Sequence, residues 1–104
     1  MALPVFEALA DPTRRALLDR LRDDGPCSLT ALADDRPMTR QAVAKHLDVL
    51  ADAGLVTAWR QGRERLHALR PEPLRAVDDW LAPYAAAWDE RLARLKAHVE
   101  ETDR

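Results

Sequence analysis

The side chains best suited to binding chemistry lie in the middle of the chain, between residues 36 and 70. This segment holds seven basic and three acidic side chains, a net charge of +4, whereas residues 1–35 and 71–104 each carry −3. The net charge of −2 for all 104 residues therefore hides a basic segment between acidic flanks. Such a segment favours an anionic partner, and an ordinary solvated surface is the alternative interpretation.

Within this basic segment, residues 39–53 have the pattern of a capped helix. Thr39 can cap its first turn, and Gly54 can end it. Val43 and Leu47 share one face, which must pack inward. The opposite face is small, polar and basic, and such a face fits the major groove of DNA, unless it is merely a solvated face of a helical domain. The residues predicted to contact DNA on this helix are Thr39, Arg40, Gln41, Ala44, Lys45 and Asp48.

A second basic cluster follows that helix. Residues 55–60 and 64–69 read as two short strands joined near Gly62, which predicts a hairpin. Arginine side chains on such a hairpin can reach a phosphate backbone or a minor groove. The alternative is a charged edge that only prevents aggregation. The hairpin residues predicted to contact DNA are Arg60, Arg63 and Arg65.

The elements that must position these residues are mostly helical. A short helix is expected near residues 3–9, Asp11 can cap a second helix that ends at Gly25, and Ser28 can cap a third through about Ala33. The order of helix, helix, short helix, turn, longer helix and hairpin is that of a winged helix-turn-helix. We expect a mainly α fold with a small β-hairpin and a C-terminal helical dimerisation tail. The expected single domain spans 1–104, with the helix-turn-helix at about 28–54, the wing at about 55–70 and the dimerisation helices at about 73–102.

The tail carries an apolar stripe from Leu74 to Val99, whose members are three or four residues apart. Pro83 lies inside the stripe and should kink or break the helix. The aromatic side chains of the stripe favour a core and dimer interface over a ligand-binding box. The residues predicted to pair two copies of the chain are Phe6, Leu81, Tyr84, Trp88 and Leu92.

Several stretches of the chain are distinctive. They are Ala10-Asp11-Pro12-Thr13-Arg14-Arg15, Thr39-Arg40-Gln41-Ala42-Val43-Ala44-Lys45-His46-Leu47, Leu50, Ala53-Gly54-Leu55-Val56 and Gly62-Arg63. In them the chain resembles the ArsR family of winged helix-turn-helix transcriptional regulators over nearly its whole length. The resemblance implies a homodimer that binds double-stranded DNA, usually a repressor acting on a short inverted repeat. The tail resembles the metal-independent branch of the family at Trp80, Tyr84, Trp88, Arg91, Leu92 and Leu95.

Two alternative functions remain open at the level of sequence. In the first, a metal, an oxidant or a small-molecule effector changes DNA affinity through Cys27, His98 or the aromatic tail. A thiol sensor needs a lowered pKa, which a helix N-terminus could supply. A closed zinc site usually needs four ligands, and His98 and Glu101 provide two, so we expect no metal or other cofactor. In the second alternative, the winged helix binds protein instead of DNA.

The other two histidines, His46 and His67, are expected mainly to pack within the fold. His67 is expected to pack along the second strand of the hairpin, and His46 to pack beside the inward face of its helix, from which it could reach a phosphate.

Several classes of protein are disfavoured by composition and motif. The chain has no paired carboxylates with a pocket signal, no Ser-His-Asp set and no phosphate-binding glycine loop, so we expect no enzyme. No apolar run approaches the roughly 18–20 residues of a membrane span, and residues 1–4 show no signal peptide. A single cysteine suits a reducing compartment, so the expected location is the cytoplasm.

Overall fold

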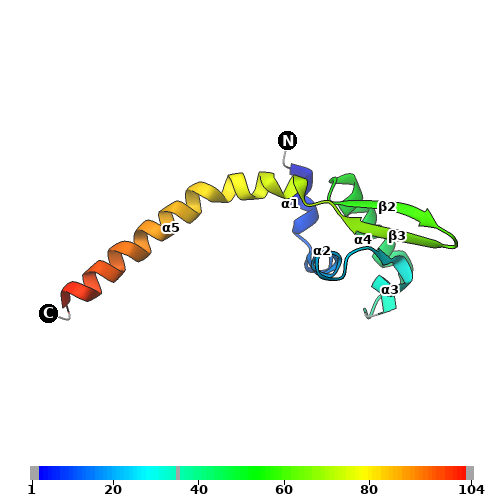
Figure 1. Ribbon diagram of the computed structural model, residues 1–104, viewed down its shortest axis with the longest axis horizontal. Coiled ribbons are helices and arrows are strands. Elements are labelled where there is room, and N and C mark those ends of the chain that lie inside the picture. The colour runs from blue at the N-terminus through cyan, green and yellow to red at the C-terminus, as the bar shows by residue number, and fades with distance from the viewer. Residues whose placement is uncertain (1–2, 35, 103–104) are drawn as a thin grey trace.

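The computed structural model describes residues 3–34 and 36–102, and it places four helices and a small sheet ahead of one long helix (Figure 1). The elements in chain order are α1 (Leu3–Leu9), α2 (Pro12–Asp24), β1 (Cys27–Ser28), α3 (Leu29–Asp34), α4 (Arg40–Asp52), β2 (Val56–Gln61), β3 (Glu64–Leu69), the 3-10 turn η1 (Glu72–Leu74) and α5 (Arg75–Thr102). This arrangement confirms the predicted mainly α fold with a hairpin. Asp35, in the predicted turn before Pro37, lies outside the described residues.

The two longer N-terminal helices begin at the capping residues that the sequence predicts. An Asp11 carboxylate oxygen accepts hydrogen bonds from the backbone amides of Thr13 at 2.7 Å and Arg14 at 3.1 Å. The Thr39 hydroxyl accepts one from the amide of Ala42 at 3.1 Å. These bonds satisfy amides that have no partner within the helix, so short polar side chains fix where α2 and α4 start.

The core lies where α2, α3 and α4 meet. Burying a leucine side chain contributes roughly 1.5–3 kcal/mol, so a small set of such residues accounts for much of the packing energy. The inward face predicted for α4 is buried as expected. The largest fully buried side chains are Leu17, Leu21, Leu32, Val43, Leu47, Leu50 and Leu55.

The predicted hairpin is present, with β2 one residue further along than expected. Gln61 pairs with Glu64, so Gly62 and Arg63 alone form the turn. Gly62 has φ +65° and Arg63 has no positive φ, as in a type II′ turn, whose first central position favours glycine. Leu55 precedes the strand because its amide bonds the Leu50 carbonyl at 2.9 Å and thereby completes the end of α4.

The strand β1 is absent from the sequence-based prediction. It is only two residues long, too short to show an alternating pattern, and it pairs antiparallel with β3 so that Cys27 lies opposite His67. The sheet order among the described residues is β1-β3-β2, so β3 is the central strand. Ser28 keeps its predicted capping role as well, because its hydroxyl accepts from the Ala31 amide at 3.1 Å.

The tail forms one helix, α5, preceded by the short turn η1. Of the two outcomes expected at Pro83, a kink or a break that divides the tail into two helices, the break does not occur, because α5 continues through Pro83. A proline there removes the hydrogen bond to the carbonyl of Asp79, but Asp79 is exposed, so water can satisfy that oxygen. Figure 1 shows α5 as a continuous ribbon that curves as it leaves the other elements, and the molecule measures 68 × 30 × 20 Å. No helix in residues 3–34 and 36–102 has both the length and the apolar character needed to cross a membrane.

Candidate nucleic-acid interface

The outer face of α4 is the polar surface that the sequence predicts. Gln41, Lys45 and Asp48 are exposed, Ala44 between them is half-buried, and Thr39 and Arg40 are exposed at the N-terminal end. The opposite face holds the core, so the packing of α4 directs this polar face outward. The structure therefore brings five of the predicted residues onto one side of α4, with Thr39 as the cap at its N-terminal end.

The three predicted wing arginines cluster at the end of the hairpin. Arg60 and Arg65 are directly opposite each other in the β2–β3 pairing, and Arg63 lies in the turn. All three are exposed. Like charges directly opposite each other on a sheet are destabilising, so this pair repels unless an anion neutralises it. Figure 1 shows the hairpin extending away from the helices, on the side opposite α5.

These basic side chains are also available for a partner. In contrast, Arg22 is neutralised locally by Asp23 at 2.8 Å and Asp19 at 3.4 Å, and contacts with Asp23 and Asp19 raise its pKa. Within residues 3–34 and 36–102, no ion pair engages the side chains of Arg40, Lys45, Arg60, Arg63 or Arg65.

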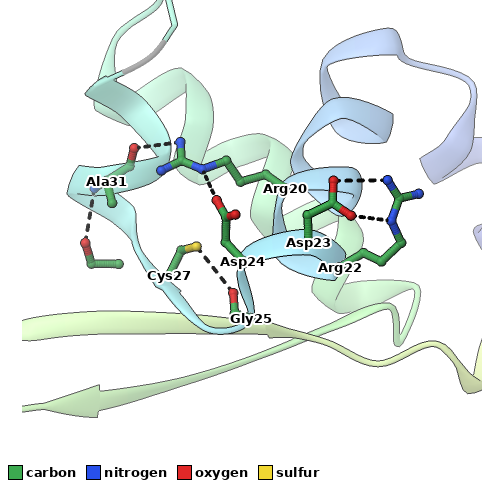
Figure 2. A network of polar contacts seen from close by, with 8 residues as sticks. Arg20, Arg22, Asp23, Asp24, Gly25, Cys27 and Ala31 are labelled. Atoms are coloured by element: carbon green, nitrogen blue, oxygen red, sulfur yellow. Dashed lines mark hydrogen bonds and ion pairs between the residues drawn. The ribbon is translucent and has the colours of Figure 1, made fainter.

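An arginine that sequence reasoning missed links α2 to α3. Arg20 bonds Asp24 at 2.9 Å within α2, and its Nη1 donates to the Ala31 carbonyl of α3 at 3.1 Å. Figure 2 shows the Arg20 side chain reaching from α2 to α3 between these partners. Arg20 thus ties the two helices that precede the turn. The i, i+4 spacing of Arg20 and Asp24 could have predicted their ion pair. That spacing does not predict the hydrogen bond from Arg20 to Ala31 of α3.

His67 lies in the sheet below the wing arginines, and its burial confirms the expectation that it packs along β3. Only 5% of its surface is exposed, and Nδ1 is buried without a hydrogen-bond partner. Burial lowers the pKa of His67, and the nearby Arg65 charge lowers it further, while the Cys27 backbone and Asp48 act in the opposite direction. His67 is therefore a neutral core residue of the sheet.

Cys27 does not have the environment of a reactive thiol. It is buried, and its Sγ lies 3.3 Å from the Gly25 carbonyl oxygen, to which it donates (Figure 2). Burial raises the pKa of Cys27, Arg20 opposes this increase and Asp24 adds to it. Burial of Cys27 therefore acts against the lowered pKa that a redox sensor requires. The described residues contain no cluster of three or more potential metal ligands, and His98 and Glu101 are exposed on α5.

The predicted dimer residues form an exposed apolar stripe on α5. Leu81, Tyr84, Trp88 and Leu92 have between 45% and 61% of their surfaces exposed. Phe6 differs because it is half-buried, with its ring edge-on to Trp80 of the same chain at 5.7 Å between centroids. The structure thus brings α1 and the start of α5 together, and most of the stripe is left exposed by the part of the chain that the structure describes.

Comparison with known proteins places this geometry among transcriptional regulators. A family model described as "Helix-turn-helix domain" matches residues 9–57. The HTH-type transcriptional regulator YuzN of Bacillus subtilis is 46% identical over 77 residues, which cover 68% of this chain and 84% of YuzN.

Solved structures give the same result. The crystal structure of the ArsR family transcriptional regulator RHA00566 is 42% identical, with a TM-score of 0.73 over 83% of this chain and 88% of that one. The solution structure of the homodimeric winged helix-turn-helix DNA-binding domain Mb0332 from Mycobacterium bovis is 28% identical, with a TM-score of 0.61 over 86% of this chain and 80% of that one.

Proposed function

Because the chain belongs to the ArsR family of winged helix-turn-helix transcriptional regulators, we propose that it binds a palindromic DNA operator as a homodimer and represses transcription there. The observation that carries this proposal is the pair of arginines, Arg60 and Arg65, that face each other on the exposed wing and have no anionic partner among the described residues. A phosphate backbone supplies the charge that relieves their repulsion. The helix-turn-helix at about 28–54, the wing at about 55–70 and the tail at about 73–102 are the proposed functional parts of one domain over 1–104.

We assign base recognition to the outer face of α4. Arg40 and Lys45 can donate to the acceptors of guanine, Gln41 can pair with adenine, and the Ala44 methyl can contact thymine. Asp48 can accept a hydrogen bond from the cytosine amine. Thr39 and the free amides at the N-terminus of α4 suit a phosphate. The wing arginines Arg60, Arg63 and Arg65 would then fix the register on the backbone or in the adjacent minor groove.

We assign dimerisation to α5 and α1. The stripe of α5 presents large apolar side chains to water, and a contiguous apolar surface of this kind marks an interaction site. The homodimeric state of Mb0332, which shares this fold, supports the second copy of the chain as its partner. Two-fold symmetry would place two α4 helices about 34 Å apart, one turn of DNA, which matches an inverted repeat.

Repression follows in this proposal from occupancy of a promoter, which blocks the polymerase. The site of action is the cytoplasm, the proposed partners are DNA and a second copy of the chain, and no catalytic step or cofactor is involved. A protein-binding role for the winged helix is the competing outcome that the following experiment separates.

The deciding experiment is a titration of the protein against DNA from upstream of its own gene, with scrambled DNA of equal length as the control. We expect specific binding that weakens steeply with salt, because Lys and Arg contacts release counterions from phosphate. Arg63→Ala should make the slope of log affinity against log salt shallower by about one unit. Arg22→Ala is the matched control, since it removes the same charge from a residue already paired on α2, and its slope should not change. Equal binding to promoter and scrambled DNA would refute the proposal.

A further inference from the structure

Arg14, at the start of α2, holds two other helices through one guanidinium group. Its Nε donates to the Ala8 carbonyl at 2.7 Å and its Nη2 to the Glu7 carbonyl at 2.9 Å, both at the C-terminal end of α1. Its Nη1 lies 3.3 Å from Nδ1 of His46 on α4. Both side chains are partly shielded from water. A planar fork with donors in fixed directions is well suited to such a three-way contact.

A hydrogen bond between Arg14 and His46 requires one chemical form of that ring. A guanidinium has donors and no acceptor, so Nδ1 of His46 must accept the hydrogen bond. An imidazole that accepts at Nδ1 is neutral and carries its proton on Nε2. Asp11, the cap of α2, has a lowered pKa chiefly because the backbone amide of Arg14 donates a hydrogen bond to its carboxylate.

The end of α1 that Arg14 holds belongs to the same helix that contacts α5. Phe6 of α1 packs edge-on against Trp80, and Trp80 in turn lies 5.0 Å from Tyr84 between ring centroids. A continuous set of contacts therefore runs from the exposed stripe of α5 through α1 and Arg14 to His46 of α4. Rigid elements joined in this way can couple two surfaces energetically. A measured coupling between the two surfaces is required to prove it.

We propose that Arg14 is a positioning residue that couples the dimer helices to the DNA-reading helix, and that it acts through the Nδ1 atom of His46. This inference rests on the proposed function, because it assigns a determinant of DNA affinity to a residue that does not itself contact DNA. Loss of the Arg14 fork would leave α4 folded but free to change its angle relative to α1.

Arg15 offers a matched control beside it. Its Nη1 donates to the Leu9 carbonyl at 2.7 Å, so it also binds the end of α1. Among the described residues, the polar contacts of Arg15 do not include α4. Arg15→Gln therefore removes a similar charge and a similar contact with α1, without touching the link to His46.

The first experiment needs no DNA. A long-range proton–nitrogen spectrum of the histidine rings reports which nitrogen of His46 carries the proton. We expect the Nε2–H form in the native protein and in Arg15→Gln, and a mixture of both forms in Arg14→Gln. A native protein with the proton on Nδ1 would overturn the inference, whatever the protein binds.

The second experiment measures DNA affinity for four variants whose folding is checked by circular dichroism. Arg14→Gln should bind about tenfold more weakly than native protein, the effect expected for one lost hydrogen bond to a charged group, and Arg15→Gln should bind within about twofold. In His46→Asn, the amide oxygen occupies the place of Nδ1 and should retain binding. In His46→Gln, the amide reaches only the place of Nε2, and binding should fall as in Arg14→Gln.

Three results would overturn the inference while the native protein still binds its promoter. The first is equal DNA affinity of Arg14→Gln and Arg15→Gln. The second is native DNA affinity in His46→Gln together with reduced affinity in His46→Asn. The third is an equal loss of DNA affinity in both His46 variants. Failure of the native protein to bind any DNA would instead refute the proposed function. The ring-nitrogen spectrum would still test the Arg14–His46 contact in that case, because it needs no DNA.

Discussion

Two groups of arginines in this chain differ in what their guanidinium groups touch. Arg14, Arg15 and Arg20 donate to backbone carbonyls of neighbouring helices and hold the scaffold together. Arg60 and Arg65 instead face each other on an exposed strand pair. The sequence identified the second group through its local excess of positive charge. It could not identify the first, because a bond to a backbone carbonyl depends on the tertiary approach of two helices and leaves no trace in residue type.

The repulsion between Arg60 and Arg65 predicts that the wing lowers the stability of the free protein while it raises the affinity for DNA. Arg60→Ala removes one of two like charges that lie opposite each other, so we expect the free protein to become more stable by a few tenths of a kcal/mol, up to about 1 kcal/mol. The same variant should bind DNA more weakly, because one phosphate contact is lost. Urea unfolding and DNA titration at matched salt concentrations measure the two effects.

Arg63→Ala is the control for that prediction, since Arg63 lies in the turn with no arginine opposite. It should weaken DNA binding without raising stability. A loss of stability in Arg60→Ala would show that the two arginines do not repel each other in the free protein.

His67 predicts a loss of stability in mild acid. Burial lowers its pKa in the folded protein below the value of 6.5 for an unperturbed histidine, so the unfolded chain binds the proton more readily. The stability that the neutral ring contributes is therefore present above about pH 6.5 and is lost as the pH falls below that value towards the folded-state pKa. Urea unfolding between pH 7.5 and about pH 5 should show this loss.

His67→Leu places an apolar side chain that cannot titrate at this position of the sheet. The stability of this variant should therefore change less over the same range of pH. Parallel curves for the native protein and His67→Leu would contradict the assignment of this effect to His67.

At the scale of elements, the sequence predicted well those features that depend on neighbours along the chain. The caps at Asp11 and Thr39 and the hairpin around Gly62 depend on local geometry, and local geometry is encoded locally. The turn itself is one residue shorter than predicted, because Gln61 pairs with Glu64. The strand β1 escaped prediction because two residues become a strand only through the presence of β3. The sequence left open whether Pro83 would kink or break the helix. The helix continues because the penalty for proline is smaller where water reaches the freed carbonyl, and exposure is a property of the folded chain.

The cap of α4 can be tested apart from DNA. Thr39→Ala removes the hydroxyl that accepts from the Ala42 amide, and we expect a loss of about 1 kcal/mol in the free energy of unfolding. Thr39→Ser retains the acceptor and should stay within a few tenths of a kcal/mol of the native value. Denaturant unfolding without DNA measures both, and equal stability of the two variants would show that the cap contributes nothing.

At the scale of the whole molecule, α5 dominates the shape. It spans 28 residues, about 42 Å at 1.5 Å per residue, and its second half lies beyond the other elements (Figure 1). A helix in this position has little of its own chain to pack against, so its apolar stripe needs a second copy for burial. The sequence predicted the stripe from its spacing, but the spacing could not show that the rest of the chain leaves it uncovered.

The proposed dimer predicts a specific response to charge on the stripe. Trp88→Glu places a carboxylate where a large apolar side chain should be buried, and we expect the protein to sediment as a monomer and to lose operator binding. Glu90→Gln changes the charge by one unit in the opposite sense, on the opposite side of α5, and should remain dimeric. Analytical ultracentrifugation distinguishes the two, and an unchanged mass for Trp88→Glu would place the dimer contact elsewhere.

The uncovered stripe of α5 also affects how the protein responds to its own abundance. If operator binding requires two chains joined along this helix, then below the dissociation constant of the dimer the active species varies with the square of the chain concentration. A modest change in synthesis or degradation would then produce a disproportionate change in promoter occupancy. The gene under its control would be silenced above a threshold of expression, and dilution by cell growth would be sufficient to release it.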